Sequence, residues 1–320
     1  MKILFLHLSD IHIEKREDIN VINSQKIADS LASAGEFHKV VIFVSGDIAY
    51  SGEKAQYESA WDFFGTVTTA IGKKYQVRPQ IFIVPGNHDV NYGGKSISNQ
   101  ELQDLKNKSR YDHAIPGELK KQWHFSNLAN GSHCFNHENP LIFRKELNFD
   151  GFKIEINLLN SAIFSSLEED KGLHYMPADV IKEIQTPTEA DMAISVMHHS
   201  HHWFSNSEEM EQALFQKNAI IFYGHEHIPD EQDIKTNGTK VKIMRGGVLS
   251  NRGNWDHSSF NVAVLDSETY LFSKFVFNWN VEEDVYMPAK DEDEIIDKKP
   301  SNRTAFTPKE SFVTWILADS

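Results

Sequence analysis

Short runs of apolar residues, rich in valine, isoleucine and phenylalanine, recur along the chain, and each ends abruptly in polar residues. Apolar runs of this length without polar alternation predict strands that are buried on both faces. Helical patterns at 24–34 and 56–74 lie between the first of these runs. Alternation of strands with helices is typical of an α/β fold with a covered sheet. The six predicted strands are 3–8, 40–44, 80–84, 154–159, 193–197 and 219–223.

Two later segments depart from this pattern. After residue 228 strands and turns alternate without a helical pattern, and strands are predicted at 240–245, 260–265 and 270–278. Residues 91–140 are polar and separate two of the core strands. An insertion of this length is too long for a plain loop, so we expect it to form helices of its own and to cover one side of the molecule.

The end of the chain has a different composition. The segment 281–306 is predicted to be an exposed acidic linker, because residues 282–299 contain eight acidic and three basic side chains. A capping box with proline at the first helical position begins at Thr307 and predicts an amphipathic helix over 307–320. We expect this helix to dock on the core, to bind a protein partner or a second copy of the chain, or to begin a further domain. Its apolar face holds Phe312, Trp315 and Ile316.

Composition and charge narrow the class of protein. The 320 residues are 40% apolar and carry 32 basic and 46 acidic side chains, which gives a net charge of −14 and indicates a folded chain of one large domain or two small ones. The acidic excess disfavours a non-specific nucleic-acid binder. A single cysteine, Cys134, excludes a disulfide scaffold and a cysteine zinc site. No apolar run is long enough for a membrane span and no signal sequence is evident, so a cytoplasmic protein is predicted.

Metal-binding types of side chain follow five of the six predicted strands. The carboxyl ends of strands in a covered α/β sheet lie at one edge, so we expect these side chains to converge. Carboxylate, amide and imidazole ligands without sulfur suit divalent manganese, iron, zinc, cobalt or nickel. The candidate ligands are Asp10, His12, Asp47, Asn87, His198, His225 and His227.

Seven candidate ligands are too many for one ion and are about right for two. Asp47 is the expected bridge between two ions because a carboxylate has two oxygens. The charge of two divalent ions exceeds the charge of Asp10, Asp47 and a bridging hydroxide together, so the site should attract an anion within an acidic protein. Paired metal ions are widely used for in-line displacement at phosphorus.

The order of the motifs resembles one family. Asp-x-His, Gly-Asp, Gly-Asn-His-Asp, a single His and Gly-His-x-His occur in that order between Asp10 and His227, as in the calcineurin-like metallophosphoesterase superfamily. The amino-acid sequence at 44–52 and 159–162 resembles that of the bacterial cyclic-nucleotide-phosphodiesterase-type branch of this superfamily. The resemblance implies a four-layer αββα sandwich with two mixed sheets, here with a helical insertion, and a catalytic domain over 1–280.

The resemblance also implies an activity and roles for the site residues. The expected enzyme is a dinuclear metal-dependent hydrolase in which a metal-bridging hydroxide attacks a small phosphodiester or nucleotide, or a phosphomonoester. His88 corresponds to the histidine that is not a ligand and that stabilises the transition state or protonates the leaving oxygen. By resemblance the first ion takes Asp10, His12, Asp47 and His227, and the second takes Asp47, Asn87, His198 and His225.

Several alternatives stay open at the level of sequence. Ser200 replaces the proline that usually follows this histidine pair, so His199 is an alternative to His198 as ligand. Asp89 is predicted either to orient a metal-bound imidazole or to cap the following helix. Tyr50 and Ser51 stand where protein phosphatases of the superfamily have aspartate and arginine, which argues against that activity.

Two other functions remain as alternatives to a phosphodiesterase of small molecules. One is a DNA or RNA nuclease, for which a positive cluster in the insertion supplies a candidate contact surface. The other is an effector or regulatory domain of a larger assembly, for which the C-terminal helix would be the contact. The positive cluster consists of Lys106, Lys108, Arg110, Lys120 and Lys121.

Overall fold

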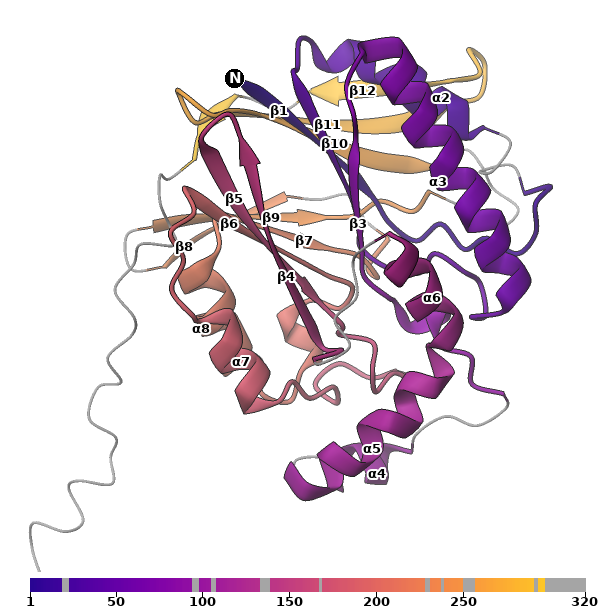
Figure 1. Ribbon diagram of the computed structural model, residues 1–320, viewed down its shortest axis with the longest axis vertical. Helices are drawn as coiled ribbons and strands as arrows, with labels where there is room; N and C mark the ends of the chain where they lie inside the picture. The colour runs from indigo at the N-terminus through magenta and orange to yellow at the C-terminus, as the bar shows by residue number, and fades with distance from the viewer. Residues whose placement is uncertain are drawn as a thin grey trace, which may run out of the picture.

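Two mixed β-sheets pack face to face, with helices on the outer face of each (Figure 1). The computed structural model describes residues 1–18, 23–93, 98–104, 108–132, 139–166, 169–227, 231–236, 239–249, 257–290 and 293–296. The α/β class and the four-layer αββα arrangement of helix, sheet, sheet and helix that the motif order implied are confirmed.

The first sheet combines the N-terminal strands with strands from the end of the chain. Its order is β12-β11-β10-β1-β2-β3, and β13 pairs with β11 at one end. Strands β1, β2 and β3 are parallel, whereas β10, β11 and β12 are antiparallel to their neighbours. The strands are β1 (Lys2–Leu8), β2 (Lys39–Val44), β3 (Gln80–Ile83), β10 (Ser259–Asp266), β11 (Leu271–Asn280), β12 (Val285–Lys290) and β13 (Glu294–Ile295).

The second sheet is parallel at its centre and antiparallel at its edges. Its order is β4-β5-β6-β7-β9-β8. Strands β5, β6, β7 and β9 are parallel, so their carboxyl ends lie at one edge of the sheet. The strands are β4 (Ile142–Phe149), β5 (Phe152–Leu159), β6 (Met192–Met197), β7 (Ile220–Tyr223), β8 (Glu231–Thr236) and β9 (Thr239–Arg245).

Helices cover both outer faces, as the apolar patterns require. Helices α2 (Ser24–Ser30) and α3 (Lys54–Tyr75) lie over the first sheet, and α7 (Ala178–Ile184) and α8 (Ser207–Lys217) lie over the second (Figure 1). A capping box between Glu53 and Gln56 begins α3. Its buried face then includes Phe63, Val67 and Ile71. Between the sheets, Phe5, Phe43 and Phe222 pack their rings together.

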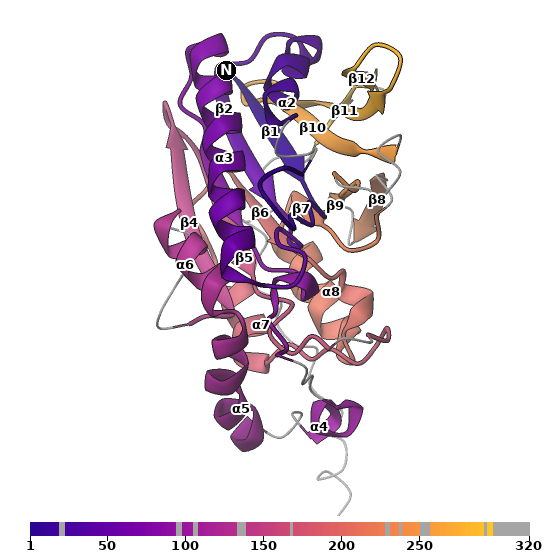
Figure 2. The same ribbon diagram turned by 90° about the vertical axis from the view of Figure 1, so that its right-hand side faces the viewer.

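The insertion forms helices, as predicted. They are α4 (Asn99–Asp104), α5 (Lys108–Lys121) and α6 (Trp123–Gly131). Helix α6 contributes Phe125 and Leu128 to the main core, whereas α4 and α5 extend beyond the end of the sandwich (Figure 2). The insertion is anchored to the core by a side-chain hydrogen bond, in which Asn160 Nδ2 donates to Gln122 Oε1 at 2.7 Å.

The predicted exposed linker from residue 281 is wrong for its first part. Strand β12 continues the first sheet as the edge partner of β11, and β13 pairs with the other end of β11. The apolar residues between the acidic ones explain this pairing, since Tyr286 is buried against Phe260 and Trp279. The remainder of the linker and the predicted helix over 307–320 lie outside the described residues.

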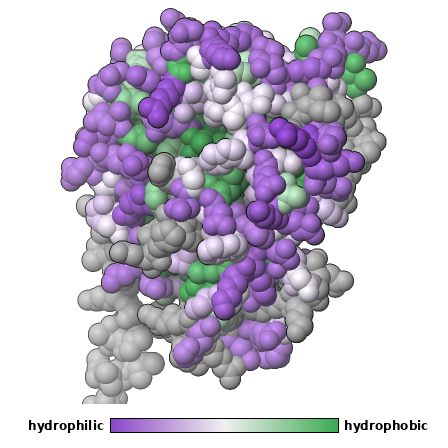
Figure 3. Space-filling model, turned by 45° about the vertical axis from the view of Figure 1, so that its right-hand side comes forward, coloured by the Kyte–Doolittle hydropathy of each residue, from purple (hydrophilic) through white to green (hydrophobic). Residues whose placement is uncertain are grey.

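The face of the molecule drawn in Figure 3 is mainly polar. Figure 3 shows hydrophilic residues over most of one face, with hydrophobic residues gathered in small separate patches. Within the part of the chain that the structure describes, no helix combines the length and the apolar composition needed to cross a membrane.

Candidate metal centre

The loops that follow β1, β2, β6 and β7 meet at the carboxyl ends of the two sheets. Backbone hydrogen bonds tie the first two loops together, because the His12 amide donates to the Asp47 carbonyl at 2.9 Å. On the second sheet the Gly224 amide donates to the His198 carbonyl at 3.0 Å. The predicted convergence of strand ends is therefore present in the structure.

The backbone at these strand ends adopts an unusual conformation. Left-handed φ angles are uncommon outside glycine and cost of order 1 kcal/mol or more each. Such angles persist only where the surrounding contacts require them, and they are frequent at functional sites. They occur here at Asp10 (53°), His12 (49°), Asp47 (52°), His225 (69°) and His227 (57°).

One group of side chains gathers around Asp10. The His227 Nε2 atom lies 3.0 Å from Asp10 Oδ1, and the His12 Nε2 atom lies 4.0 Å from the same oxygen. Asp10 and His12 come from the loop after β1, whereas His227 comes from the loop after β7. These three side chains present a carboxylate oxygen and two ring nitrogens that could hold one metal ion.

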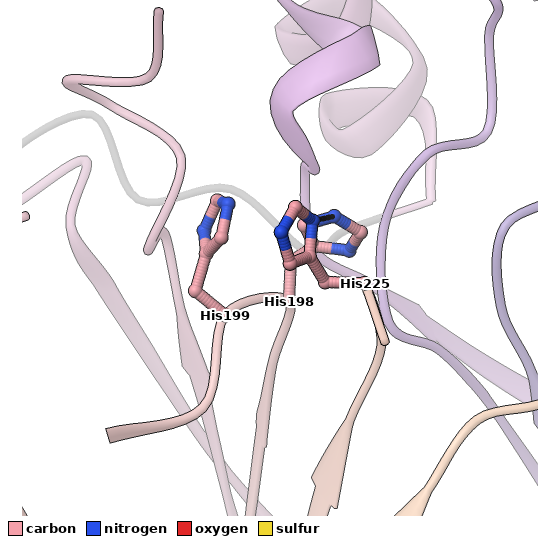
Figure 4. Close-up of side chains that lie close together, drawn as sticks. All are labelled: His198, His199 and His225. Atoms are coloured by element: carbon pink, nitrogen blue, oxygen red, sulfur yellow. Dashed lines mark hydrogen bonds between the residues drawn. The ribbon is translucent and has the colours of Figure 1, made fainter. Parts of the chain in front are cut away.

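A second group gathers around Asn87. The His198 Nε2 atom and the His225 Nδ1 atom lie 3.0 and 3.2 Å from Asn87 Oδ1. The two ring nitrogens lie 3.2 Å apart, and Figure 4 shows the two rings turned toward one another. Each of the three residues follows a different strand.

Asp47 lies between the two groups. Its Oδ1 atom is 3.5 Å from His198 Nε2, and its Oδ2 atom is 3.8 Å from His12 Nε2. The His88 amide also donates to Oδ1 at 2.8 Å, which fixes the orientation of the carboxylate. The structure thus brings all seven predicted ligands into two groups that share Asp47. Their role as metal ligands stays a prediction.

Burial keeps three of the four imidazoles of the two groups neutral, because it lowers the pKa of His12, His198 and His225 to about 3 in each case. The fourth, His227, differs, because its hydrogen bond to Asp10 raises its pKa. Burial would raise the pKa of Asp10, but contacts with His227 and other histidines outweigh it and lower that pKa. Burial, followed by the charge of Asp10, raises the pKa of Asp47. Neutral imidazoles beside crowded carboxylates are a donor set for a cation.

The orientation of His198 tests whether a cation fits. Its Nδ1–H group donates to the Ser45 carbonyl at 2.7 Å, so its Nε2 atom carries a lone pair. That lone pair faces the Asn87 side chain and the Asp47 carboxylate. Electron-pair donors directed at one region repel each other unless a cation lies between them, so the residues present fit a metal ion.

Gly86 determines how closely the two groups approach. A Cβ atom at this position would lie 2.1 Å from Asp47 Oδ1 and 2.5 Å from the Asp47 amide nitrogen. Such distances are far inside van der Waals contact. The Asp47 loop can therefore lie in its observed place only because residue 86 has no side chain.

The Gly86→Ala variant is expected to weaken Mn²⁺ binding at least about tenfold, because the methyl group must displace the Asp47 carboxylate. Isothermal titration calorimetry with Mn²⁺ measures this loss. Gly65→Ala is the matched control, since a Cβ there meets nothing within 4 Å. Equal Mn²⁺ affinity in the two variants would contradict the tight fit at Gly86.

His88 lies beside both groups. Its ring is 4.6 Å from the His12 ring, centre to centre. Its Nδ1–H group donates to the Tyr50 carbonyl at 2.7 Å, which leaves Nε2 as the nitrogen that can accept or donate a proton. His88 and Asn87 line a pocket of about 420 Å³ with Tyr92 and Asn91.

The structure distinguishes the two histidines of the predicted pair. The ring of His199 stands apart from the adjacent rings of His198 and His225 (Figure 4). Its Nε2 atom lies 3.1 Å from Glu169 Oε2. His198 is the one whose Nε2 atom faces Asn87 and Asp47. His198 thus faces Asn87 and Asp47 whereas His199 faces Glu169, and the choice of His198 as ligand stays a prediction.

Asp89 has a role other than the two predicted from the sequence. Its carboxylate accepts hydrogen bonds from the amides of Ile48, Ala49 and Gly86 and from the Tyr57 hydroxyl, at 2.9 to 3.1 Å. Among the described residues, its hydrogen-bond partners include neither a predicted ligand imidazole nor an amide of the helix that follows. Asp89 instead ties the loop after β2 to the loop after β3, which positions Asp47.

Sequence reasoning gave no weight to Glu169 or to the carbonyls of Ser45 and Tyr50, which orient imidazoles in or beside the site. Backbone carbonyls leave no mark in a sequence, because every residue has one. Glu169 does not directly follow a strand and belongs to none of the motifs, so only its position in space identifies it.

The structure describes only two side chains of the positive cluster in the insertion, those of Lys120 and Lys121. Lys121 pairs with Glu118 at 2.7 Å, which offsets its charge. Lys120 is exposed. Lys106 and the side chains of Lys108 and Arg110 lie outside what the structure describes.

The comparison with known protein families agrees with this description. Residues 3–229 match the family model for calcineurin-like phosphoesterases. No curated protein sequence is similar enough to count as a match. Among solved structures, a single mutant of Vps29 from Entamoeba histolytica is 11% identical, with a TM-score of 0.39 over 90% of this chain and 99% of that one.

Two further solved structures are similar at the same level. Vps29 from Entamoeba histolytica complexed with zinc is 10% identical, with a TM-score of 0.38 over 90% of this chain and 98% of that one. The hypothetical protein PH1004 from Pyrococcus horikoshii is 12% identical, with a TM-score of 0.37 over 84% of this chain and 86% of that one.

Proposed function

Because the chain belongs to the calcineurin-like phosphoesterase family, we propose that it is a dinuclear metal-dependent phosphoesterase that hydrolyses phosphodiester bonds. The observation that carries this proposal is the position of Asp47, which directs one carboxylate oxygen toward His198 and the other toward His12. A carboxylate placed in this way can hold two cations at once.

The two groups of side chains would bind one ion each and would share Asp47. Asp10, His12 and His227 would hold the first, and Asn87, His198 and His225 would hold the second. Two divalent ions, when bound, activate water as the nucleophile and offset charge on the phosphoryl oxygens. Manganese, iron, zinc, cobalt and nickel all suit these ligands.

His88 is the proposed acid for the leaving oxygen. The Tyr50 carbonyl accepts from Nδ1 and so directs Nε2 away from the protein backbone. A protonated Nε2 can donate to a phosphoryl oxygen or to the leaving group, which lowers the barrier to departure. The position of His88 beside Asn87 and on the wall of the pocket supports this role.

The pocket supports a small diester with an uncharged organic group as substrate. Neither lysine nor arginine is among the described residues that line it, so a second phosphate would have no cationic partner there. Tyr50 and Tyr92 offer ring faces, and Ser51 and Asn91 offer polar groups. A volume of about 420 Å³ is enough for a substituent of nucleoside size.

Hydrolysis of bis(p-nitrophenyl) phosphate by the manganese-loaded protein tests this function. The His88→Ala variant is expected to lose about a hundredfold to a thousandfold in kcat, because the hydrogen bond from Nε2 to a phosphoryl oxygen in the transition state is lost. His113→Ala, on the exposed side of α5, is the matched control and should retain activity. Equal turnover of the two variants would contradict the role of His88.

The same preparation distinguishes a small-molecule phosphodiesterase from a nuclease. Single-stranded and double-stranded DNA are offered in parallel with cyclic and acyclic nucleotides. The proposal expects turnover of the small diesters and much slower cleavage of DNA. Faster cleavage of DNA, reduced by reversing the charge of Lys120, would favour the nuclease instead.

A further inference from the structure

A third cluster of metal-binding side chains lies beside the two groups. The Glu169 Oε2 atom is 3.1 Å from His199 Nε2, and the Glu169 Oε1 atom is 3.2 Å from His174 Nε2. All three side chains are almost fully buried, with 6% or less of each exposed. None of the three is among the seven predicted ligands.

The geometry within this cluster favours a common central atom. When two ligand atoms bind one ion at about 2.1 Å, they lie about 3.0 to 3.4 Å apart in octahedral or tetrahedral arrangements. The separations from Glu169 to His199 and to His174 fall within this range. The ligand atoms of all three side chains lie within 4.8 Å of one another. In the absence of an ion, the Glu169 carboxylate is also within hydrogen-bond distance of both imidazoles.

The segments that carry the cluster are held in place independently of any ion. The amides of Gly172 and His174 both donate to the Trp203 carbonyl, at 3.1 and 3.0 Å, and the Ser205 amide donates to the His174 carbonyl at 2.6 Å. The segment before α7 is thereby fixed alongside the residues that follow β6. A site with ligands held in this way loses little conformational entropy when an ion binds.

The second ring nitrogen of His199 is also oriented. Its Nδ1 atom lies 3.2 Å from the Ser161 hydroxyl, and the same hydroxyl accepts from the His198 and His199 amides. A histidine that binds a metal usually has its other nitrogen hydrogen-bonded in this manner, because that contact fixes the ring and its tautomer. His199 therefore has its Nε2 atom fixed in direction toward Glu169.

We propose that Glu169, His174 and His199 form a third metal site for a divalent transition ion such as Zn²⁺. One carboxylate and two imidazoles are a common ligand set for zinc and for ferrous iron. The bound ion would connect the segment before α7 to the end of β6, next to His198. It would thus hold in place the loop that carries a ligand of the dinuclear centre.

The zinc content of the full chain tests this site. Protein stripped of metal is loaded with excess Zn²⁺ and desalted. The zinc content per chain is then measured by inductively coupled plasma mass spectrometry. Glu169→Gln and His174→Ala are each expected to contain about one equivalent less than the unaltered protein. His113→Ala, which alters an exposed histidine of α5, should contain the same amount as the unaltered protein.

The difference between variants, not the total, decides the outcome, so the test is independent of how many ions the other two groups bind. An Asp47→Asn chain should still lose one further equivalent when Glu169→Gln is added. If His174→Ala does not fold, Glu169→Gln decides, because it keeps the shape of the side chain. Equal zinc content in Glu169→Gln and the unaltered protein would overturn the third site and leave a hydrogen-bonded cluster only.

Discussion

An Asp47→Asn variant is expected to lose at least about a thousandfold in hydrolysis of bis(p-nitrophenyl) phosphate, because both metal groups depend on this carboxylate. Its two oxygens face His198 and His12, and an amide offers only one oxygen and no charge. Steady-state kinetics in Mn²⁺ give the loss, and calorimetric titration should show that binding of at least one ion is lost.

The same variant should not destabilise the metal-free protein. Burial and the charge of Asp10 raise the pKa of Asp47, so its ionisation at neutral pH opposes folding. Asparagine removes that charge and can still accept from the His88 amide. Thermal unfolding in a chelator should therefore give a Tm equal to that of the unaltered protein or above it.

Asp179→Asn is the matched control, since this aspartate is exposed in the first turn of α7. It should retain turnover and Mn²⁺ binding. If Asp47→Asn kept its activity, or if it lost activity only because the metal-free fold collapsed, the shared position of Asp47 would not be the basis of function.

The largest expected effect on stability comes from breaking the buried ion pair between β5 of the second sheet and helix α8. Glu155 Oε1 lies 2.9 Å from Lys217 Nζ, and both side chains are at most 5% exposed. Glu155→Gln should lower the free energy of unfolding by about 3 kcal/mol, because it leaves a buried ammonium group without its counterion. Urea unfolding followed by circular dichroism measures the change.

The effect should depend on pH. Burial would raise the pKa of Glu155, but hydrogen bonds from Thr188 and Lys217 outweigh it and lower that pKa below 4.5. The folded pKa is below the unfolded one, so the stabilisation is complete above pH 4.5 and is lost as the pH falls further. The difference between Glu155→Gln and the unaltered protein should therefore shrink below pH 4.5.

Glu146→Gln provides the comparison for this pair. Glu146 pairs with Lys153 at 3.3 Å across β4 and β5, and both side chains are about two-fifths exposed. Exposed pairs contribute about 0 to 1 kcal/mol. Equal urea midpoints for Glu146→Gln and Glu155→Gln would show that burial does not increase the cost of removing the partner of Lys217.

The central strands and the order of the site motifs could be predicted from the sequence. Buried strands need continuous apolar runs, and helix α3 needs a capping box and an apolar face, so both leave local patterns. Strands β4, β8 and β12 escaped prediction because polar and charged residues lie within or directly beside them, so they form no continuous apolar run. The segment that contains β12 resembled an acidic linker for that reason.

The sequence by itself determined which residue types follow each buried strand, and hence that Asp10, Asp47, Asn87 and the histidines would meet at the strand ends. The family resemblance already implied how they divide into two groups. Only the tertiary structure decided which of His198 and His199 faces Asn87, and that Glu169 joins His199. The reason is physical. Periodicity and turn chemistry act between near neighbours in the chain, whereas the direction of a side chain toward a distant loop depends on packing between segments that no local pattern encodes.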